Sequence, residues 1–399
     1  MKKKQLHPRF QDAIHFKNYW ENGNGKKMIE WSGAEVSLKD FDQYAPLYHK
    51  ADELGDQVVN EFYAIKPYAE ASKEMESYLR TGIPQHAVVP DSVCKLIEYS
   101  ETLPAWINQK LLQLGAENCM RSGLSAFISL RDYTLLGGYY YAYLNKPLVF
   151  TGALKKGAMK RLSETLDFWI NVSRYDAMKI HRKGYEYAVK TRLIHSYARL
   201  KLKQHYTGWD NETMGEPLNL WDMTATSNGF SLVYLHGLYK LGMDISKEEE
   251  LGVFHLWKYI GYLLGIPPEI LPDNKKEAVE RFYLWTSIQP PADEDSVMLA
   301  QTLVQESLEN PILKYTFQRK LLRYIHISSA EFLLDEEVKK ALQIPKMPGA
   351  RVFPKTVQLA NQVAQKTLSR KTLVANGNKA QVSILNQYLD LIKGSNFHH

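Results

Sequence analysis

The chain has 399 residues, of which 45% are hydrophobic and 12% aromatic, so it holds enough apolar material for a large core. Its two cysteines, Cys94 and Cys119, exclude a fold built on disulfides and offer no zinc-binding spacing. The net charge of +6, the lack of a signal-peptide pattern and the lack of an apolar run of membrane-spanning length indicate a cytoplasmic protein with no nucleic-acid partner.

Helical periodicity dominates the first part of the chain, after a polar arm at residues 1–50 whose glycines predict irregular structure. Apolar side chains recur at helical spacing over residues 51–82, and Pro67 interrupts this pattern. A further helix is expected to begin near Asp91, which is suited to an N-cap, and another is expected over residues 106–114.

The middle of the chain combines small, aromatic and charged side chains. Residues 117–145 favour either tight helix–helix packing or the wall of a substrate channel, because small residues alternate with tyrosines. The helix expected over residues 158–172 places Arg161, Glu164 and Thr165 on one inner face. On spacing alone, these three residues indicate an ion pair one turn apart beside a surface hydroxyl.

An unusual helix is predicted over residues 179–203, because one stripe of it carries His181, Arg192, His195 and Arg199. An imidazole flanked one turn either way by guanidinium groups suits an anionic planar cofactor, with His195 holding a metal and the arginines pairing with carboxylates. The alternative is a solvated histidine among arginines that face water. His181 lies about 21 Å from His195 along such a helix and cannot be a second ligand to the same metal.

The second half of the chain continues as helices without the alternating pattern of strands. We expect these helices over residues 221–241, 244–265, 274–288, 294–308, 311–344, 357–369 and 380–393. No carboxylate lies between Glu337 and Asp390, and three prolines form a linker at 345–354.

The sequence therefore predicts an all-α protein. We expect an N-terminal arm at 1–50, a large helical domain at 51–344 and a basic C-terminal helical extension at 345–399. The basic extension suits a weak contact with an anionic membrane surface, and a solvated helical extension is the alternative.

Three short motifs resemble the rubber oxygenase/MpaB family, which includes the latex clearing proteins. They are RLSET at 161–165, RLIHSYAR at 192–199 and LWKYIGYLLGIPPEILP at 256–272. Their order and spacing carry the resemblance, which covers roughly residues 115–275.

The resemblance implies a helical fold with a globin-like core that holds heme b. By the same resemblance, His195 is the proximal ligand of the heme iron, and Arg161 and Thr165 lie on the distal side. Arg192 and Arg199 would flank the cofactor near its propionates. A neutral imidazole is a suitable donor to iron, and the group on its other nitrogen tunes that donation.

Two departures separate this chain from the rubber-cleaving members of the family. Glu164 stands where latex clearing proteins have a lysine between the distal Arg and Thr. The stretch from Tyr133 to Ser163 contains no carboxylate that matches the family's glutamate. The resemblance therefore implies heme binding more strongly than it implies rubber cleavage.

The leading hypothesis is a heme-dependent oxygenase that acts with O₂ on an apolar, isoprenoid or lipid-like substrate. Arg161 and Thr165 would supply donors to developing negative charge, and Glu164 would act as an acid/base group or pair with Arg161. Two alternatives stay open. One is a heme protein without oxygenase activity, such as a carrier, sensor or peroxidase-like protein, and the other is a heme-free helical interaction protein.

Overall fold

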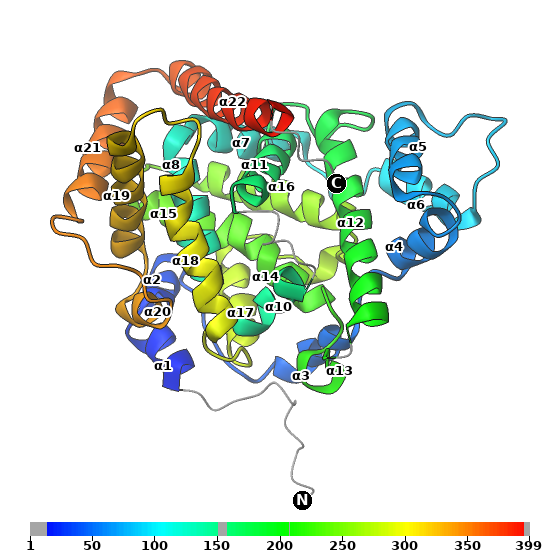
Figure 1. Ribbon diagram of the computed structural model, residues 1–399, viewed down its shortest axis with the longest axis horizontal. Coiled ribbons are helices and arrows are strands. Elements are labelled where there is room, and N and C mark those ends of the chain that lie inside the picture. The colour runs from blue at the N-terminus through cyan, green and yellow to red at the C-terminus, as the bar shows by residue number, and fades with distance from the viewer. Residues whose placement is uncertain (1–13, 151–157, 207, 395–399) are drawn as a thin grey trace, which may run out of the picture.

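The fold is built from helices. The computed structural model describes residues 14–150, 158–206 and 208–394, and these residues form helices and loops without a β-strand (Figure 1), which confirms the all-α prediction. The lysines that open the predicted N-terminal arm and the last five residues of the predicted extension lie outside the described residues. None of the described helices combines the length and apolar composition of a membrane span.

The N-terminal arm packs on the C-terminal half of the molecule. From residue 14 onward it forms short helices rather than the irregular structure that its glycines predict: α1 (Ile14–Glu21), α2 (Asn24–Ser32), α3 (Phe41–Tyr44) and a 3₁₀ turn (Ala45–His49). The indole Nε1 of Trp20 donates to the Thr286 hydroxyl at 2.8 Å, and the Asn24 amide donates to the Leu333 carbonyl at 2.9 Å. These bonds tie the arm to residues that follow it by about 270 to 310 positions.

The next helices begin close to where the sequence predicts them. They are α4 (Glu53–Val58), α5 (Tyr68–Thr81), α6 (Asp91–Glu101) and α7 (Gln109–Arg121). Helix α7 packs closely on α16 (Lys247–Leu263), whose first turn has a capping box between Ser246 and Glu249. A Cβ atom added to Gly115 of α7 would lie 2.3 Å from the Gly252 carbonyl oxygen of α16, so only glycine permits this approach.

Besides the π turn that follows α4 (Val59–Tyr63), two stretches that read as regular helical patterns contain π-helical turns. Residues 123–150 form α8 (Gly123–Ile128), a π turn (Ser129–Leu135), α9 (Leu136–Gly138) and α10 (Ala142–Phe150). Residues 220–240 form α14 (Leu220–Asn228), a second π turn (Gly229–Val233) and α15 (Tyr234–Lys240). The two π turns contact each other, and π turns are frequent at functional sites because they redirect side chains.

Helices α11 (Ala158–Val172) and α12 (Lys183–His205) pack against each other near the centre of the molecule. The bounds of α11 match the prediction. Helix α12 begins at Lys183 rather than Lys179, because His181 adopts a left-handed conformation with φ 63°. The prediction that His181 shares the stripe of α12 is therefore wrong, and its Nδ1 instead lies 3.0 Å from the Leu79 carbonyl oxygen.

The C-terminal helices cover the body rather than extend from it. They are α17 (Lys275–Thr286), α18 (Glu294–Glu309), α19 (Thr316–Leu333), α20 (Glu336–Ala341), α21 (Val352–Thr367) and α22 (Arg370–Gly394), and a short α13 (Asn211–Met214) follows α12. Figure 1 shows α21 beside α19 at the left edge and α22 across the top. Helix α22 contacts α7, α8 and α11, so it closes the molecule over the helices that carry the predicted site.

Candidate functional site

A large cavity of about 1620 Å³ lies inside the helical body. This exceeds the roughly 300–1,000 Å³ of typical small-molecule sites and leaves room for a cofactor together with a substrate. Its walls come from α8 to α12, from the π turn that follows α14, from α19 and from both C-terminal helices.

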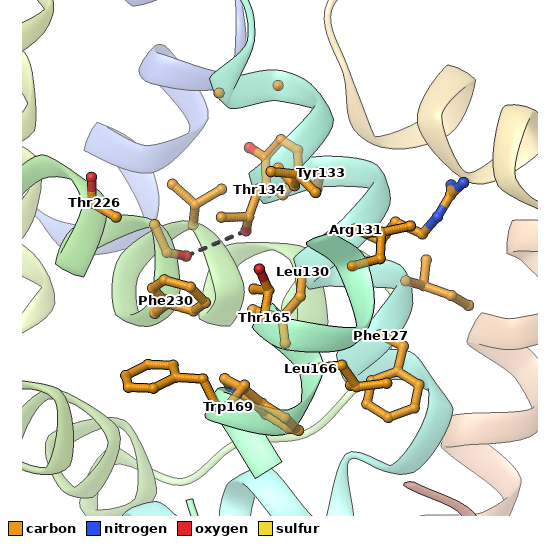
Figure 2. A pocket seen from close by; sticks show the side chains of 18 of the residues that line it. Phe127, Leu130, Arg131, Tyr133, Thr134, Thr165, Leu166, Trp169, Thr226 and Phe230 are labelled. Carbon is orange, nitrogen blue, oxygen red and sulfur yellow. Dashed lines mark hydrogen bonds between the residues drawn. The ribbon is translucent and has the colours of Figure 1, made fainter. Parts of the chain in front are cut away.

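Most of the wall is apolar or aromatic. Figure 2 shows one part of it, where Phe127 and Leu130 face side chains from α11 and Phe230 closes the opposite side in this view. Trp169 of α11 is fully buried beneath them. Such a lining excludes water and strengthens any electrostatic contact made inside the cavity.

His195 lies on α12 and lines this cavity. Its Nδ1 atom is buried and has no hydrogen-bond partner among the described residues. Burial and the positive charges of Arg199 and Arg161 lower the pKa of His195, and Asp52 opposes them, so that the pKa is about 4. The ring is therefore neutral at pH 7 and carries a nitrogen lone pair, which is the form that ligates metals.

Arg161 and Thr165 reach the same cavity from α11. The Nε of Arg161 is buried and lacks a partner among the described residues. Burial raises the pKa of the nearby Tyr139 hydroxyl, while the charge and the hydrogen bond of Arg161 act in the opposite direction. In Figure 2, Thr165 stands between Phe230 and Leu130. The structure thus brings Arg161, Thr165 and His195 to one enclosed space.

Glu164 occupies a different environment from its neighbours. It is exposed, although it belongs to the cavity lining, so it lies where the cavity meets solvent. The buried Nε of Arg161 has no hydrogen-bond partner among the described residues, so it does not bond Glu164. Of the two roles predicted for Glu164, pairing with Arg161 is not what the structure shows, and the acid/base role stays a prediction.

Arg192 and Arg199 do not line the cavity, because both guanidinium groups turn toward the N-terminal helices. Arg192 forms a two-point ion pair with Asp52, at 2.6 Å from Nε and 2.7 Å from Nη2, and its guanidinium lies 4.8 Å from the centre of the Tyr99 ring. Arg199 binds Asp56, with Nη2 at 2.5 Å from Oδ1. The sequence predicted that these arginines would pair with carboxylates of a cofactor, whereas the structure pairs them with two aspartates of the protein itself.

We call these four residues, Asp52, Asp56, Arg192 and Arg199, the α4–α12 clamp. Charged hydrogen bonds of this two-point kind fix orientation as well as distance. Since the two arginines bracket His195 one turn on either side, the clamp fixes the rotation of α12 that aims His195 at the cavity. Gly265 completes the packing, since a Cβ there would lie 2.7 Å from Asp52 and 2.8 Å from Arg192 Nε.

Sequence reasoning missed Asp52 and Asp56. Asp52 is the N-cap of α4 and accepts a hydrogen bond from the Gly55 backbone, which is the ordinary explanation for an aspartate at that place. The signal that could have found them is spacing. Asp52 and Asp56 lie one helical turn apart, and Arg192 and Arg199 lie two turns apart, so each long arginine side chain can reach one carboxylate. That match becomes visible only once α4 and α12 are known to be neighbours.

The described residues fit the group that the family resemblance implies. A heme site that activates O₂ needs a neutral imidazole to hold the iron, an apolar slot for the ring and hydrogen-bond donors within that slot. His195 offers the first, the cavity offers the second, and Arg161 offers a buried N–H donor that no described group satisfies. Chemically, the arrangement can hold a metal on one side of an apolar space and supply hydrogen-bond donors within that space.

Three comparisons with known proteins agree on the fold and the family. The family model described as "ER-bound oxygenase mpaB/B'/Rubber oxygenase, catalytic domain" matches residues 126–362. The rubber oxygenase of Streptomyces sp. (strain K30) is 22% identical over 188 residues, which is 46% of this chain and 45% of the relative. The match thus spans a little under half of that relative.

The fold comparison extends further along the chain. The solved structure of latex clearing protein LCP in the closed state superposes with a TM-score of 0.58, over 84% of this chain and 91% of that one, at 16% sequence identity. At this identity the likeness concerns the fold. The segment matched by the family model contains Arg161, Thr165 and His195 but not Asp52 or Asp56 of the clamp.

Proposed function

The chain belongs to the ER-bound oxygenase mpaB/B'/Rubber oxygenase family, and from this premise we propose that it is a heme b-dependent oxygenase acting on an apolar substrate. The observation that carries the proposal is the unsatisfied Nδ1 of His195 in the wall of a large apolar cavity that also contains the unsatisfied Nε of Arg161. Buried polar atoms without partners are rare in native proteins and often mark a bound group.

Each residue of the site has a separate role in this proposal. His195 binds the iron through its neutral imidazole, and the α4–α12 clamp holds the helix that presents it. A bound heme supplies the iron centre that activates O₂. Arg161 and Thr165 donate hydrogen bonds to negative charge that develops in the cavity, where the low dielectric makes each bond stronger than in water. Glu164 exchanges protons with solvent at the rim.

The substrate class follows from the cavity wall. Aliphatic and aromatic side chains from several helices surround most of the space, which suits an isoprenoid or lipid-like molecule. Arg192 and Arg199 act as positioning residues, since the clamp aspartates already occupy their guanidinium groups.

The proposal is tested by an absorption spectrum and a pyridine hemochrome assay on protein produced with ample heme. We expect near-stoichiometric heme b, lost in His195→Ala and kept in His181→Ala. The second variant is a matched control, because His181 precedes the same helix but does not line the cavity. A colourless wild-type protein that also ignores added hemin would favour the heme-free interaction protein instead.

Oxygen uptake separates the enzyme from a heme protein without oxygenase activity. With heme loaded, isoprenoid or lipid-like substrates should stimulate O₂ consumption by the wild type. Arg161→Met should retain heme and lose most of this uptake, because it removes a donor but not the iron ligand. Stable heme binding without any substrate-dependent uptake would point to a carrier or sensor.

We also propose that the outer face of α21 contacts an anionic membrane surface. Val352, Leu359 and Val363 share this face and are 65%, 61% and 50% exposed, which is unusual for large apolar side chains. Exposed Lys355 and Lys366 flank them, and the sequence around them has no carboxylate to oppose binding to anionic lipid.

Vesicle flotation tests the membrane contact. The protein should float with vesicles rich in phosphatidylserine but not with phosphatidylcholine alone, and Leu359→Asp with Val363→Asp should abolish flotation. The matched control is Ile65→Asp, which alters an isoleucine that is 70% exposed elsewhere on the surface. Equal flotation with both vesicle types would contradict the electrostatic part of the proposal, and dimer formation through α21 would indicate a second copy as its partner.

A further inference from the structure

The cavity has a second polar region, contributed by residues that the site above does not use. The carboxylate of Asp132, in the π turn that follows α8, is fully buried. His326 of α19 places its Nδ1 at 2.9 Å and 3.0 Å from the two oxygens of that carboxylate. Because a carboxylate only accepts hydrogen bonds, the Nδ1 of His326 must carry the proton of this pair.

This contact fixes the direction of the His326 ring. With Nδ1 held by Asp132, the remaining nitrogen, Nε2, lies on the opposite side of the imidazole. His326 lines the cavity, and Nε2 has no hydrogen-bond partner among the described residues. The arrangement resembles the carboxylate–histidine pairs that orient an imidazole toward a ligand, and here the imidazole faces an apolar space.

The charges around His326 do not favour an anionic ligand. Arg131 donates to Asp132 at 2.7 Å and to Glu306 at 3.2 Å, and its second terminal nitrogen also bonds the Leu303 carbonyl. One guanidinium thus faces two carboxylates. Even a protonated His326 would only bring this group of charges to neutrality, so no surplus positive charge is left for a carboxylate or phosphate head group.

A hydroxyl donor lines the same region. The phenol oxygen of Tyr388, on α22, accepts a hydrogen bond from the Asn310 amide at 3.1 Å. No described group accepts the hydrogen of this phenol, and both Tyr388 and Asn310 belong to the cavity lining. We call His326, Tyr388, Asn310 and Arg131 the α19–α22 polar end of the cavity. Figure 2 shows Arg131 extending away from Thr165, toward the helices of this end.

The geometry points to a binding site for the hydroxyl of a long-chain apolar alcohol. Nε2 of His326 can form a hydrogen bond with that hydroxyl, and the phenol of Tyr388 can donate to its oxygen. A plain hydrocarbon would leave these polar groups without hydrogen-bond partners, and a carboxylate would meet no free cation at this end of the cavity. The alcohol's chain would then occupy the apolar part of the cavity that leads toward Thr165.

This inference deepens the oxygenase proposal by naming its substrate class, and it rests on that proposal only for the reaction. It predicts that one end of the substrate is held by hydrogen bonds at α19 and α22, while carbon atoms further along the chain lie near Arg161 and Thr165. Because the head group is held at a fixed position, the distance from the hydroxyl along the chain determines which carbon atom reacts.

The test is equilibrium dialysis of the purified full-length chain, with and without heme, against tritiated dodecanol, dodecanoate and dodecane. We expect dodecanol to bind about fivefold to tenfold more tightly than dodecane, the effect of one net hydrogen bond, and dodecanoate to bind no better than dodecane. His326→Phe keeps a ring of similar shape without Nε2, and it should remove the preference for the alcohol while leaving dodecane binding unchanged. His326→Gln should restore part of the preference.

The control and the contrary outcomes are defined in the same assay. His86→Phe makes the same change at an exposed loop histidine and should behave as wild type. Equal binding of dodecanol and dodecane, a preference for dodecanoate, or an unchanged preference in His326→Phe would each overturn the inference. Because dialysis does not require heme, alcohol binding by a protein that fails the hemochrome assay would refute the oxygenase proposal and leave this site standing.

Discussion

The α4–α12 clamp makes the sharpest prediction about stability, because one substitution leaves a cation buried and unpaired. Asp52→Asn removes the charge that Arg192 faces while keeping the size of the side chain. The two side chains are only 10% and 4% exposed, and both nitrogen–oxygen distances are below 2.8 Å. Water cannot replace the lost carboxylate without opening the packing around Gly265.

The expected cost follows from burial. Removing one partner of a buried ion pair destabilises proteins by about 3–5 kcal/mol, because the other charge stays buried without compensation. Asparagine keeps one oxygen acceptor for Arg192, so we expect the lower end, about 3 kcal/mol. The stacking of the guanidinium on Tyr99 persists and offsets a little of the loss.

Urea unfolding followed by tryptophan fluorescence measures this cost, and a hemochrome assay on the same samples measures heme retention. Both should fall in Asp52→Asn, although Asp52 does not line the cavity. The control is Asp91→Asn, whose partner Lys95 is 62% exposed, so its loss should leave the stability close to that of the wild type. Replacing both Asp52 and Arg192 by leucine should recover most of the stability. A cost below about 1 kcal/mol for Asp52→Asn would refute the reasoning, since it would mean that solvent reaches the pair.

Three further predictions concern other parts of the molecule. Burial lowers the pKa of His236 to about 3, so between pH 6.5 and pH 3 the unfolded state binds more protons and the stability falls as the pH falls. His236→Gln should reduce this loss of stability in urea titrations at pH 7 and pH 5. An unchanged difference in stability between the two pH values would show that His236 is not its source. Gly115→Ala should cost about 2 kcal/mol or more in urea unfolding, since its Cβ would lie 2.3 Å from the Gly252 carbonyl, and a neutral effect would mean that α7 and α16 separate easily. Arg161→Met should lower kcat for O₂ uptake about a hundredfold with heme content preserved, and a matching loss of heme would make Arg161 a cofactor-binding residue instead.

Local signals in the sequence predicted much of the fold. The run from Ala158 to Val172 has helix formers and a clear apolar face, and both of its ends were placed correctly. The helix expected over residues 244–265 likewise corresponds to α16 (Lys247–Leu263), whose first turn has a capping box. The π turns were missed, because one extra residue in a turn shifts the helical pattern too little to stand out among apolar side chains. The left-handed residue at His181 was missed since no glycine marks it.

The site was harder to predict because its parts meet across long stretches of chain. Spacing along one helix predicted that Arg192 and Arg199 leave α12 on the same side as His195, and the structure agrees with this prediction. It could not identify their partners, since Asp52 lies 140 residues from Arg192 along the chain. For the same reason the pair of Asp132 and His326, 194 residues apart, left no signal in the sequence.

Side-chain length explains how one face of α12 serves two purposes. Arg192 and Arg199 lie within about 60° of His195 around the helix, so all three leave the backbone on the same side. The arginines are long enough to reach past the cavity edge to the aspartates at α4, whereas the short imidazole ends at the cavity wall. The N-terminal segment is therefore part of the site although it lies outside residues 126–362, where the family match falls. Asp52 and Asp56 do not line the cavity, but they neutralise the two cations that would otherwise lie unpaired beside His195.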